Sequence, residues 1–127
     1  IKIFEKIPIA ILQNKNIKSF YTRSGDVINY IESKKFEKLP IVFGNKENFK
    51  IIYENLKKLN FPLKDIKTFL FFESKRWDLV TNQNITIKLP IKNYEKSLEN
   101  FMSIKDQHNF KKYKTFDYRI NNQLILK

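Results

Sequence analysis

Cysteine is absent from this 127-residue chain, and histidine occurs once, as His108. The lack of cysteine excludes a disulfide framework, a thiolate metal site and a cysteine nucleophile. A single histidine excludes a two-histidine zinc site. The two glycines, Gly25 and Gly44, lie far apart, whereas a phosphate-cradling loop needs several glycines so that backbone N–H groups can approach the anion. The sequence therefore predicts no P-loop, no dinucleotide-binding fold and no cofactor.

Long apolar runs are absent too. The best ones, residues 7–12 and 69–72, fall well short of the roughly 18 residues of a membrane-spanning helix. The chain begins at Ile1 rather than at methionine, so we expect an upstream segment, which is where a signal or a membrane anchor would lie. A content of 42% apolar and 15% aromatic residues predicts one folded domain, with room for a fragment of a second, rather than disorder.

Arginine is scarce, because the net charge of +12 comes from 22 lysines and only 3 arginines. A charge of this size suggests a nucleic-acid or anionic-membrane partner. Arginine, however, is the better fork for phosphates and guanines, and the densest cluster, Lys111, Lys112 and Lys114, is short. We therefore interpret the charge as compositional bias on a solvated surface and predict no nucleic-acid partner.

Residue patterns typical of catalysis are missing as well. No G-x-S-x-G elbow surrounds any serine, and His108, which we expect to be exposed in a polar loop, is the one imidazole that could activate a serine. The carboxylates Glu73, Asp78 and Asp117 lie in or beside predicted strands. Asp78 follows Trp77 and should point to the opposite, solvent-facing side, where a carboxylate keeps a strand soluble. The sequence predicts no enzyme, no catalytic residue and no metal site.

Hydrophobic periodicity predicts both strands and helices. Alternating isoleucines in residues 1–11 indicate a strand, with Pro8 confined to an edge or a bulge. Apolar residues at helical spacing over residues 49–59 predict a helix with Asn45 as its N-cap, and residues 94–102 predict a second helix. The other strands are expected at residues 17–23, 27–31, 66–73, 76–81, 85–89, 113–120 and 123–127, the last two joined by a two-residue turn at Asn121-Asn122. Hairpin-connected strands with helices between the groups indicate an α+β fold with a mostly antiparallel sheet.

Short motifs also follow one another in a particular order along the chain. They are IKIFEKIPIA at 1–10, SGDVI at 24–28, LPIVFG at 39–44, RWDL at 76–79, ITIKLP at 85–90 and FDYR at 116–119. Each motif is weakly specific, but the ordered set resembles the FtsQ/DivIB cell-division family, in the form of its alphaproteobacterial branch. There are three departures: Tyr118 replaces the usual leucine, the turn at residues 82–84 lacks a glycine, and Thr22 stands near where the family often has an aspartate before the hairpin.

The resemblance implies an FtsQ-type β-domain over residues 14–127, preceded over residues 1–13 by the C-terminal strand of a truncated POTRA domain. It implies a non-enzymatic divisome scaffold that supports septum formation on the extracytoplasmic (periplasmic) face of the bacterial inner membrane. A single-pass anchor would lie upstream of residue 1. The partners it implies are divisome membrane proteins, namely an FtsB/FtsL-like coiled coil and components of the septal peptidoglycan synthase.

The strand expected at residues 123–127 is last in a meander, and an edge strand offers unpaired N–H and C=O groups to another chain. In the family, the corresponding strand accepts a strand from the FtsB partner. The resemblance implies that Ile120 packs on the partner and that Arg76 and Arg119 pair with its carboxylates. The predicted partner-binding residues are Arg76, Arg119, Ile120, Gln123, Leu124, Ile125 and Leu126. The alternative is that Ile120, Leu124 and Leu126 are core residues and that the two arginines are merely solvated.

Two other function classes stay open from the sequence. One is a POTRA-type assembly module of another extracytoplasmic system. The other is a basic nucleic-acid-binding domain, because residues 112–119 interleave aromatic and basic side chains in a way that can stack bases. An aromatic core face with a charged outer face explains that segment equally well.

Overall fold

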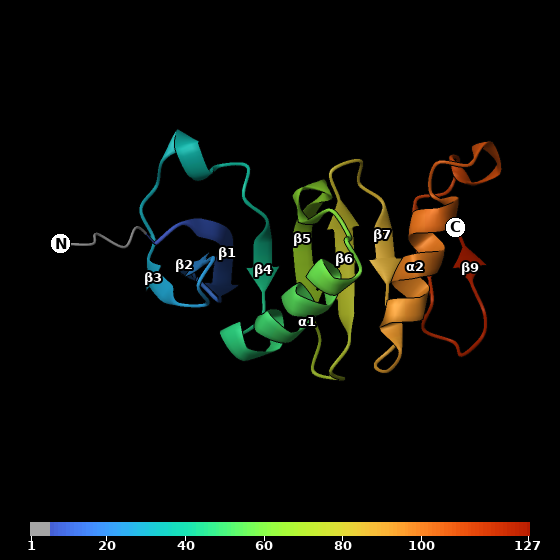
Figure 1. Ribbon diagram of the computed structural model, residues 1–127, viewed down its shortest axis with the longest axis horizontal. Coiled ribbons are helices and arrows are strands. Elements are labelled where there is room, and N and C mark those ends of the chain that lie inside the picture. Colours follow the sequence, from blue (N-terminus) through green and yellow to red (C-terminus); the bar gives the residue numbers. More distant parts are fainter. Residues whose placement is uncertain (1–5) are drawn as a thin grey trace.

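The computed structural model describes residues 6–127, which fold into a long sheet with two helices (Figure 1). The strands are β1 (Pro8–Asn14), β2 (Ile17–Thr22), β3 (Val27–Asn29), β4 (Ile41–Phe43), β5 (Ile66–Phe71), β6 (Trp77–Thr81), β7 (Thr86–Lys88), β8 (Thr115–Asp117) and β9 (Ile125–Leu126). The helices are α1 (Lys46–Lys58) and α2 (Tyr94–Ile104), with 3-10 turns η1 (Lys34–Phe36), η2 (Leu63–Asp65) and η3 (His108–Phe110). The α+β prediction with two helices is confirmed.

The nine strands form one sheet in the order β3-β2-β1-β4-β5-β6-β7-β8-β9. Most neighbouring pairs are antiparallel, as predicted, but β1–β4, β4–β5 and β7–β8 are parallel. Parallel neighbours need a crossover connection. Helix α1 supplies it between β4 and β5, and α2 supplies it between β7 and β8. Both helices lie against the same face of the sheet (Figure 1).

Local sequence explains both helices. The side chain of Asn45 accepts a hydrogen bond from the backbone N–H of Asn48 at 2.8 Å, so the predicted N-cap of α1 is confirmed. The buried face of α1 consists of Phe49, Ile52, Tyr53 and Leu56. Helix α2 buries Leu98 and Phe101. The side-chain amide of Asn55 donates to the Tyr94 hydroxyl at 2.6 Å, which ties the two helices together.

The main core lies between the sheet and the helices. One row of aligned side chains crosses six strands on this face, and its members are Val42, Phe69, Leu79, Ile87, Phe116 and Leu126. All but the last are fully buried, and each such side chain contributes about 1.5–3 kcal/mol by leaving water. Because side chains alternate along a strand, the next residue of each strand faces the uncovered side of the sheet.

The β1–β3 end also has apolar packing on the opposite face. Phe20 packs against Tyr30 and Phe36 with ring centroids 5.0 and 4.9 Å apart, so the chain after β3 folds over this end of the sheet. Strand β1 is paired with both β2 and β4, and the sheet runs on without a break. The division at residues 13–14 between a POTRA strand and the β-domain stays a prediction. The first half of the predicted strand, residues 1–5, lies outside the described residues.

The predicted C-terminal hairpin has its turn at Asn121-Asn122, where the Gln123 N–H donates to the Ile120 carbonyl at 3.1 Å, but its strands are shorter than predicted. Asp117 pairs with Ile125 in the β8–β9 ladder, so residues 118–124, which include this turn, form the connection. A two-residue type I′ turn needs a positive φ at both central positions, but of the two asparagines only Asn122, at φ 61°, has one. Strand β3 is likewise shorter than predicted and ends before Tyr30.

Candidate partner-binding site

Strand β9 is the last strand of the sheet, and in residues 6–127 no strand lies beyond it. The backbones of Lys127 and Thr115 exchange two hydrogen bonds, each of 3.1 Å. In an antiparallel ladder, successive residues direct their N–H and C=O groups alternately toward the neighbour and away from it. The N–H and C=O of Leu126 therefore point to the open edge, where another strand can bind.

The side chains of this edge divide between the two faces of the sheet. Leu126 lies opposite Phe116 on the helix-covered face, and both Leu126 and Leu124 pack against the core. Both side chains are half-buried, and their backbone still borders the open edge. Ile125 lies opposite Asp117 and is half-buried on the uncovered face.

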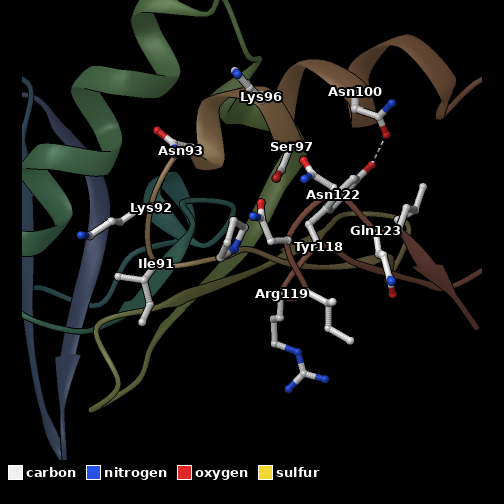
Figure 2. Close-up of a pocket in the computed structure, with 14 residues that line it drawn as sticks. Ile91, Lys92, Asn93, Lys96, Ser97, Asn100, Tyr118, Arg119, Asn122 and Gln123 are labelled. Carbon is white, nitrogen blue, oxygen red and sulfur yellow. Dashed lines mark hydrogen bonds between the residues drawn. The ribbon is translucent and has the colours of Figure 1, made fainter.

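A cleft of about 650 Å³ adjoins β9, between the N-terminal half of α2 and the connection formed by residues 118–124 (Figure 2). The Tyr118 hydroxyl donates a hydrogen bond to Asn100 Oδ1 at 2.8 Å and so fastens this connection to α2. Burial raises the pKa of Tyr118, which keeps the phenol protonated as a donor. Apolar and polar side chains share the lining, among them Pro90, Ile91, Ser97, Ile120, Gln123 and Leu124.

Ile120 is 50% exposed at the mouth of this cleft, so it does not belong to the core. Ile91 faces the same cleft and is also exposed. Two exposed isoleucines in one cleft form an apolar surface that a partner side chain can cover. Sequence reasoning missed Ile91 and the α2 half of the cleft; the signal available was an isoleucine directly after Pro90, outside the apolar face of the helix.

Arg119 is held by Asp117 through two parallel side-chain bonds. Its Nε donates to Oδ1 at 2.9 Å and its Nη2 donates to Oδ2 at 2.6 Å, while the Arg119 backbone N–H also donates to Oδ1 at 3.0 Å. These bonds lower the pKa of Asp117 to about 2. The Arg119 side chain is 43% exposed and points away from the cleft residues (Figure 2).

Arg76 is bound differently. Its guanidinium pairs with Asp78 and stacks over the Phe72 ring, 4.6 Å from the ring centroid. This arrangement leaves the Arg76 side chain only 15% exposed. The expectation that Asp78 faces solvent is wrong: it is 6% exposed, and Arg76, which directly precedes β6, pairs with it. Asp117, which is bound by Arg119, is 4% exposed. Neither Asp78 nor Asp117 is therefore a solvent-exposed carboxylate that keeps its strand soluble.

The two arginines share the uncovered face of the sheet. A row of aligned residues links them there, and its members are Asp78, Lys88, Asp117 and Ile125. Arg76 precedes β6, three strands from β9, and at a spacing of roughly 4.8 Å per strand it lies about 14 Å from the open edge. The structure thus gathers Arg119, Ile120, Gln123, Leu124, Ile125 and Leu126 at one edge and places Arg76 apart from them.

The described residues offer little for chemistry at a metal ion. No three histidine, cysteine, aspartate or glutamate side chains in residues 6–127 gather closely enough to hold one. His108 is exposed at the start of η3. Among the same residues, no helix is both long and apolar enough to cross a bilayer.

Comparison with known proteins identifies the family. The model of the "Cell division protein FtsQ/DivIB, C-terminal" family matches residues 10–119. The chain belongs to the FtsQ/DivIB cell-division family. The match includes Arg76 and Arg119 and ends just before Ile120 and β9.

Individual relatives agree with the alphaproteobacterial resemblance. FtsQ of Rickettsia bellii is 31% identical over 134 residues, covering 99% of this chain, and FtsQ of Rickettsia typhi is 30% identical over 130 residues, again 99% of the chain. FtsQ of Rhizobium meliloti is 26% identical over 106 residues, or 82% of the chain. The chain covers 48% of each Rickettsia protein and 34% of the Rhizobium protein.

A solved structure shares the fold. It is the major extracytoplasmic domain of the bacterial cell-division protein DivIB from Geobacillus stearothermophilus, with a TM-score of 0.52 and 12% sequence identity. The alignment covers 84% of this chain and 96% of that one.

Proposed function

We propose that this FtsQ/DivIB-family chain is a non-enzymatic scaffold of the division machinery that recruits FtsB/FtsL-like membrane proteins by strand addition to β9. The observation that carries the proposal is the open edge of β9, where Leu126 directs its N–H and C=O outward. Main-chain bonds to such an edge give affinity, and pockets for alternate side chains give specificity.

The surroundings of β9 select the partner strand. A backbone hydrogen bond contributes only about 0.5–1.5 kcal/mol net, so a strand as short as β9 does not hold a partner by main-chain bonds alone. The 650 Å³ cleft with Ile91 and Ile120 borders the residues that lead into β9, and Arg119, which also lines it, turns its guanidinium to Asp117 on the uncovered face. A fitting partner strand carries a large apolar side chain toward the cleft and an acidic side chain toward Arg119.

Arg119 keeps donors for such an acid. Its bonds to Asp117 use Nε and Nη2, and Nη1 has no partner in residues 6–127. Arg76 has a weaker case as a contact of the added strand, because it lies about 14 Å, or three strand spacings, from the edge and is largely covered. Arg76 would instead contact a part of the partner that extends beyond the added strand, over the uncovered face of the sheet.

Cellular placement forms part of the same proposal. The fold likeness to an extracytoplasmic DivIB domain supports a position outside the cytoplasmic membrane. The chain spans about half the length of the Rickettsia relatives. The membrane anchor and the rest of the POTRA domain enter this proposal through the sequence resemblance alone.

The test removes the outward-facing N–H of Leu126. A Leu126→Pro variant lacks this donor but keeps the inward-facing bonds of its neighbours, and an edge strand tolerates proline where its N–H faces away from the sheet. Leu126→Ala is the matched control, since it loses the side chain and retains the N–H. We expect Leu126→Pro to lose capture of the co-expressed FtsB/FtsL-like pair while Leu126→Ala keeps it. Equal capture by both variants, with both folded, would contradict strand addition.

A further inference from the structure

A second cleft, of about 340 Å³, lies at the other end of α2 from the β9 cleft. The floor of this second cleft is apolar. Phe61 and Phe101 are buried there, with stacked rings whose centroids lie 6.4 Å apart. Ile85, Met102 and Phe110 line it as half-buried side chains packed on the core. The cleft therefore gives outside groups access to apolar surface that continues into the core.

Hydrogen bonds fix both walls of the second cleft. On one side, the backbone N–H and side-chain amide of Asn82 donate to the carbonyls of Asp65 and Lys64 at 2.9 and 2.8 Å. On the other side, the turn after α2 is held by a 3.0 Å bond from the Gln107 N–H to the Ile104 carbonyl. Binding of a ligand in the second cleft costs little conformational entropy in the protein, because the walls of the cleft are already ordered.

Lysines outnumber carboxylates in the lining of the second cleft, three against two. The lysines are Lys105, Lys111 and Lys114, and the lysine-rich segment singled out in the sequence thus borders the cleft. Lys105 is 3.8 Å from Asp106, whereas no carboxylate in residues 6–127 forms a salt bridge with Lys111 or Lys114. Asp65 is the other carboxylate of the lining. The lining therefore carries a net positive charge above an apolar floor.

We infer that the second cleft binds a peptide segment of a partner protein in which one large apolar side chain is flanked by carboxylates. Its volume lies at the low end of ligand pockets, about 300–1,000 Å³, which suits one bulky side chain rather than a whole helix. The unpaired Lys111 and Lys114 supply charge complementarity for the flanking acids. Single-stranded nucleic acid fits less well, because its sites combine open stacking platforms with arginine, and no arginine lines this cleft. The inference does not depend on strand addition to β9.

The test is a titration of the full ¹⁵N-labelled chain with the peptide acetyl-Glu-Trp-Glu-amide, followed by amide NMR shifts. We expect the largest shifts at Met102, Phe110 and Lys111. Reversing both unpaired charges with Lys111→Glu and Lys114→Glu should weaken binding about tenfold, because two favourable charge pairs become repulsive. The matched control is Lys57→Glu with Lys58→Glu, the same charge change on exposed lysines at the end of α1, which should leave binding unchanged.

Further arms decide the ligand class. Acetyl-Lys-Trp-Lys-amide should bind at least tenfold more weakly, and Met102→Trp should fill the second cleft and abolish the shifts while the chain stays folded. Equal binding of both peptides, or shifts centred on Ile91 and Ile120, would overturn the assignment. So would tight binding of oligothymidylate or anionic vesicles to Lys111 and Lys114 with no peptide binding. Leu126→Pro should leave the titration unchanged, which separates failure here from failure of strand addition.

Discussion

The sheet has two edges, and they differ in what surrounds them. At one edge is β3. Close to it lies an exposed ion pair, in which Lys6 Nζ and Asp26 Oδ2 are 3.0 Å apart. At the other is β9, flanked by a cleft on one side and by the buried carboxylate of Asp117 with its arginine on the other. Both edges expose backbone groups, so exposure alone does not make a binding site. What distinguishes β9 is side-chain chemistry on both faces, which can select a partner.

The largest expected effect concerns the core beneath each edge. Phe116 is buried against Phe101, with ring centroids 5.0 Å apart, and Phe20 is buried in the β1–β3 cluster. Replacing either with alanine should lower the free energy of unfolding by about 3–5 kcal/mol, measured by urea denaturation. Only Phe116→Ala should also weaken partner capture under conditions where both variants are folded, because β9 packs on Phe116. Equal loss of capture in Phe20→Ala would mean that capture reports global stability alone.

The pH dependence of stability should separate the two edges next. The pKa of Asp117 is about 2, below its usual value of 3.8. A lowered folded-state pKa stabilises the fold above the unfolded value, and this stability disappears as the pH falls through the folded value. We expect a loss of about 2 kcal/mol between pH 4 and pH 2 that Asp117→Asn abolishes. Asp26, exposed beside Lys6, should give a much smaller change when replaced by asparagine, as urea titrations at each pH would show.

Much of this arrangement could be predicted from the sequence. Helical spacing and Asn45 located α1, and the strand runs located the β-strands. The i, i+2 spacing of Arg76–Asp78 and of Asp117–Arg119 also places each pair on one face of its predicted strand, so the burial of Asp78 under Arg76 was open to prediction. Alternation with Trp77 alone predicts solvent exposure instead, because it leaves the neighbouring cation out of account.

The rest depends on contacts between distant segments. Local alternation predicts strands but not which of them pair, so the parallel pairing produced by the α1 and α2 crossovers could not be foreseen. The same holds for residues 118–124: the tight turn at Asn121-Asn122 forms, but the residues on either side of it do not pair, and the Tyr118 bond to Asn100 fastens this connection to α2. The cleft beside β9 exists only because of that connection.

A matched pair of proline variants tests the edge comparison directly. The backbone N–H of Thr22 donates to the Asp26 carbonyl, so Asp26 directs its backbone groups toward β2. Because this direction alternates along the strand, the N–H of Asn29, three residues later, points outward from β3, as that of Leu126 does from β9. Asn29→Pro and Leu126→Pro each remove one outward donor. We expect Leu126→Pro to weaken FtsB/FtsL-like partner binding at least about tenfold, the equivalent of roughly 1.4 kcal/mol, and Asn29→Pro to leave it unchanged in calorimetric titrations. Loss of binding in Asn29→Pro alone would move the site to β3.

The smallest expected effect concerns the hydroxyl that shapes the β9 cleft. Tyr118→Phe removes the bond to Asn100, and Tyr94→Phe removes the bond from Asn55, which lies farther from β9. Each should cost about 0.5–1.5 kcal/mol of stability. Only Tyr118→Phe should also perturb the amide NMR signals of Ile120 and Gln123 and modestly weaken the partner, because that hydroxyl fastens the connection leading into β9. If both variants weakened partner binding equally, general loosening of the helices would explain the effect. The Tyr118 bond would then have no specific role in shaping the site.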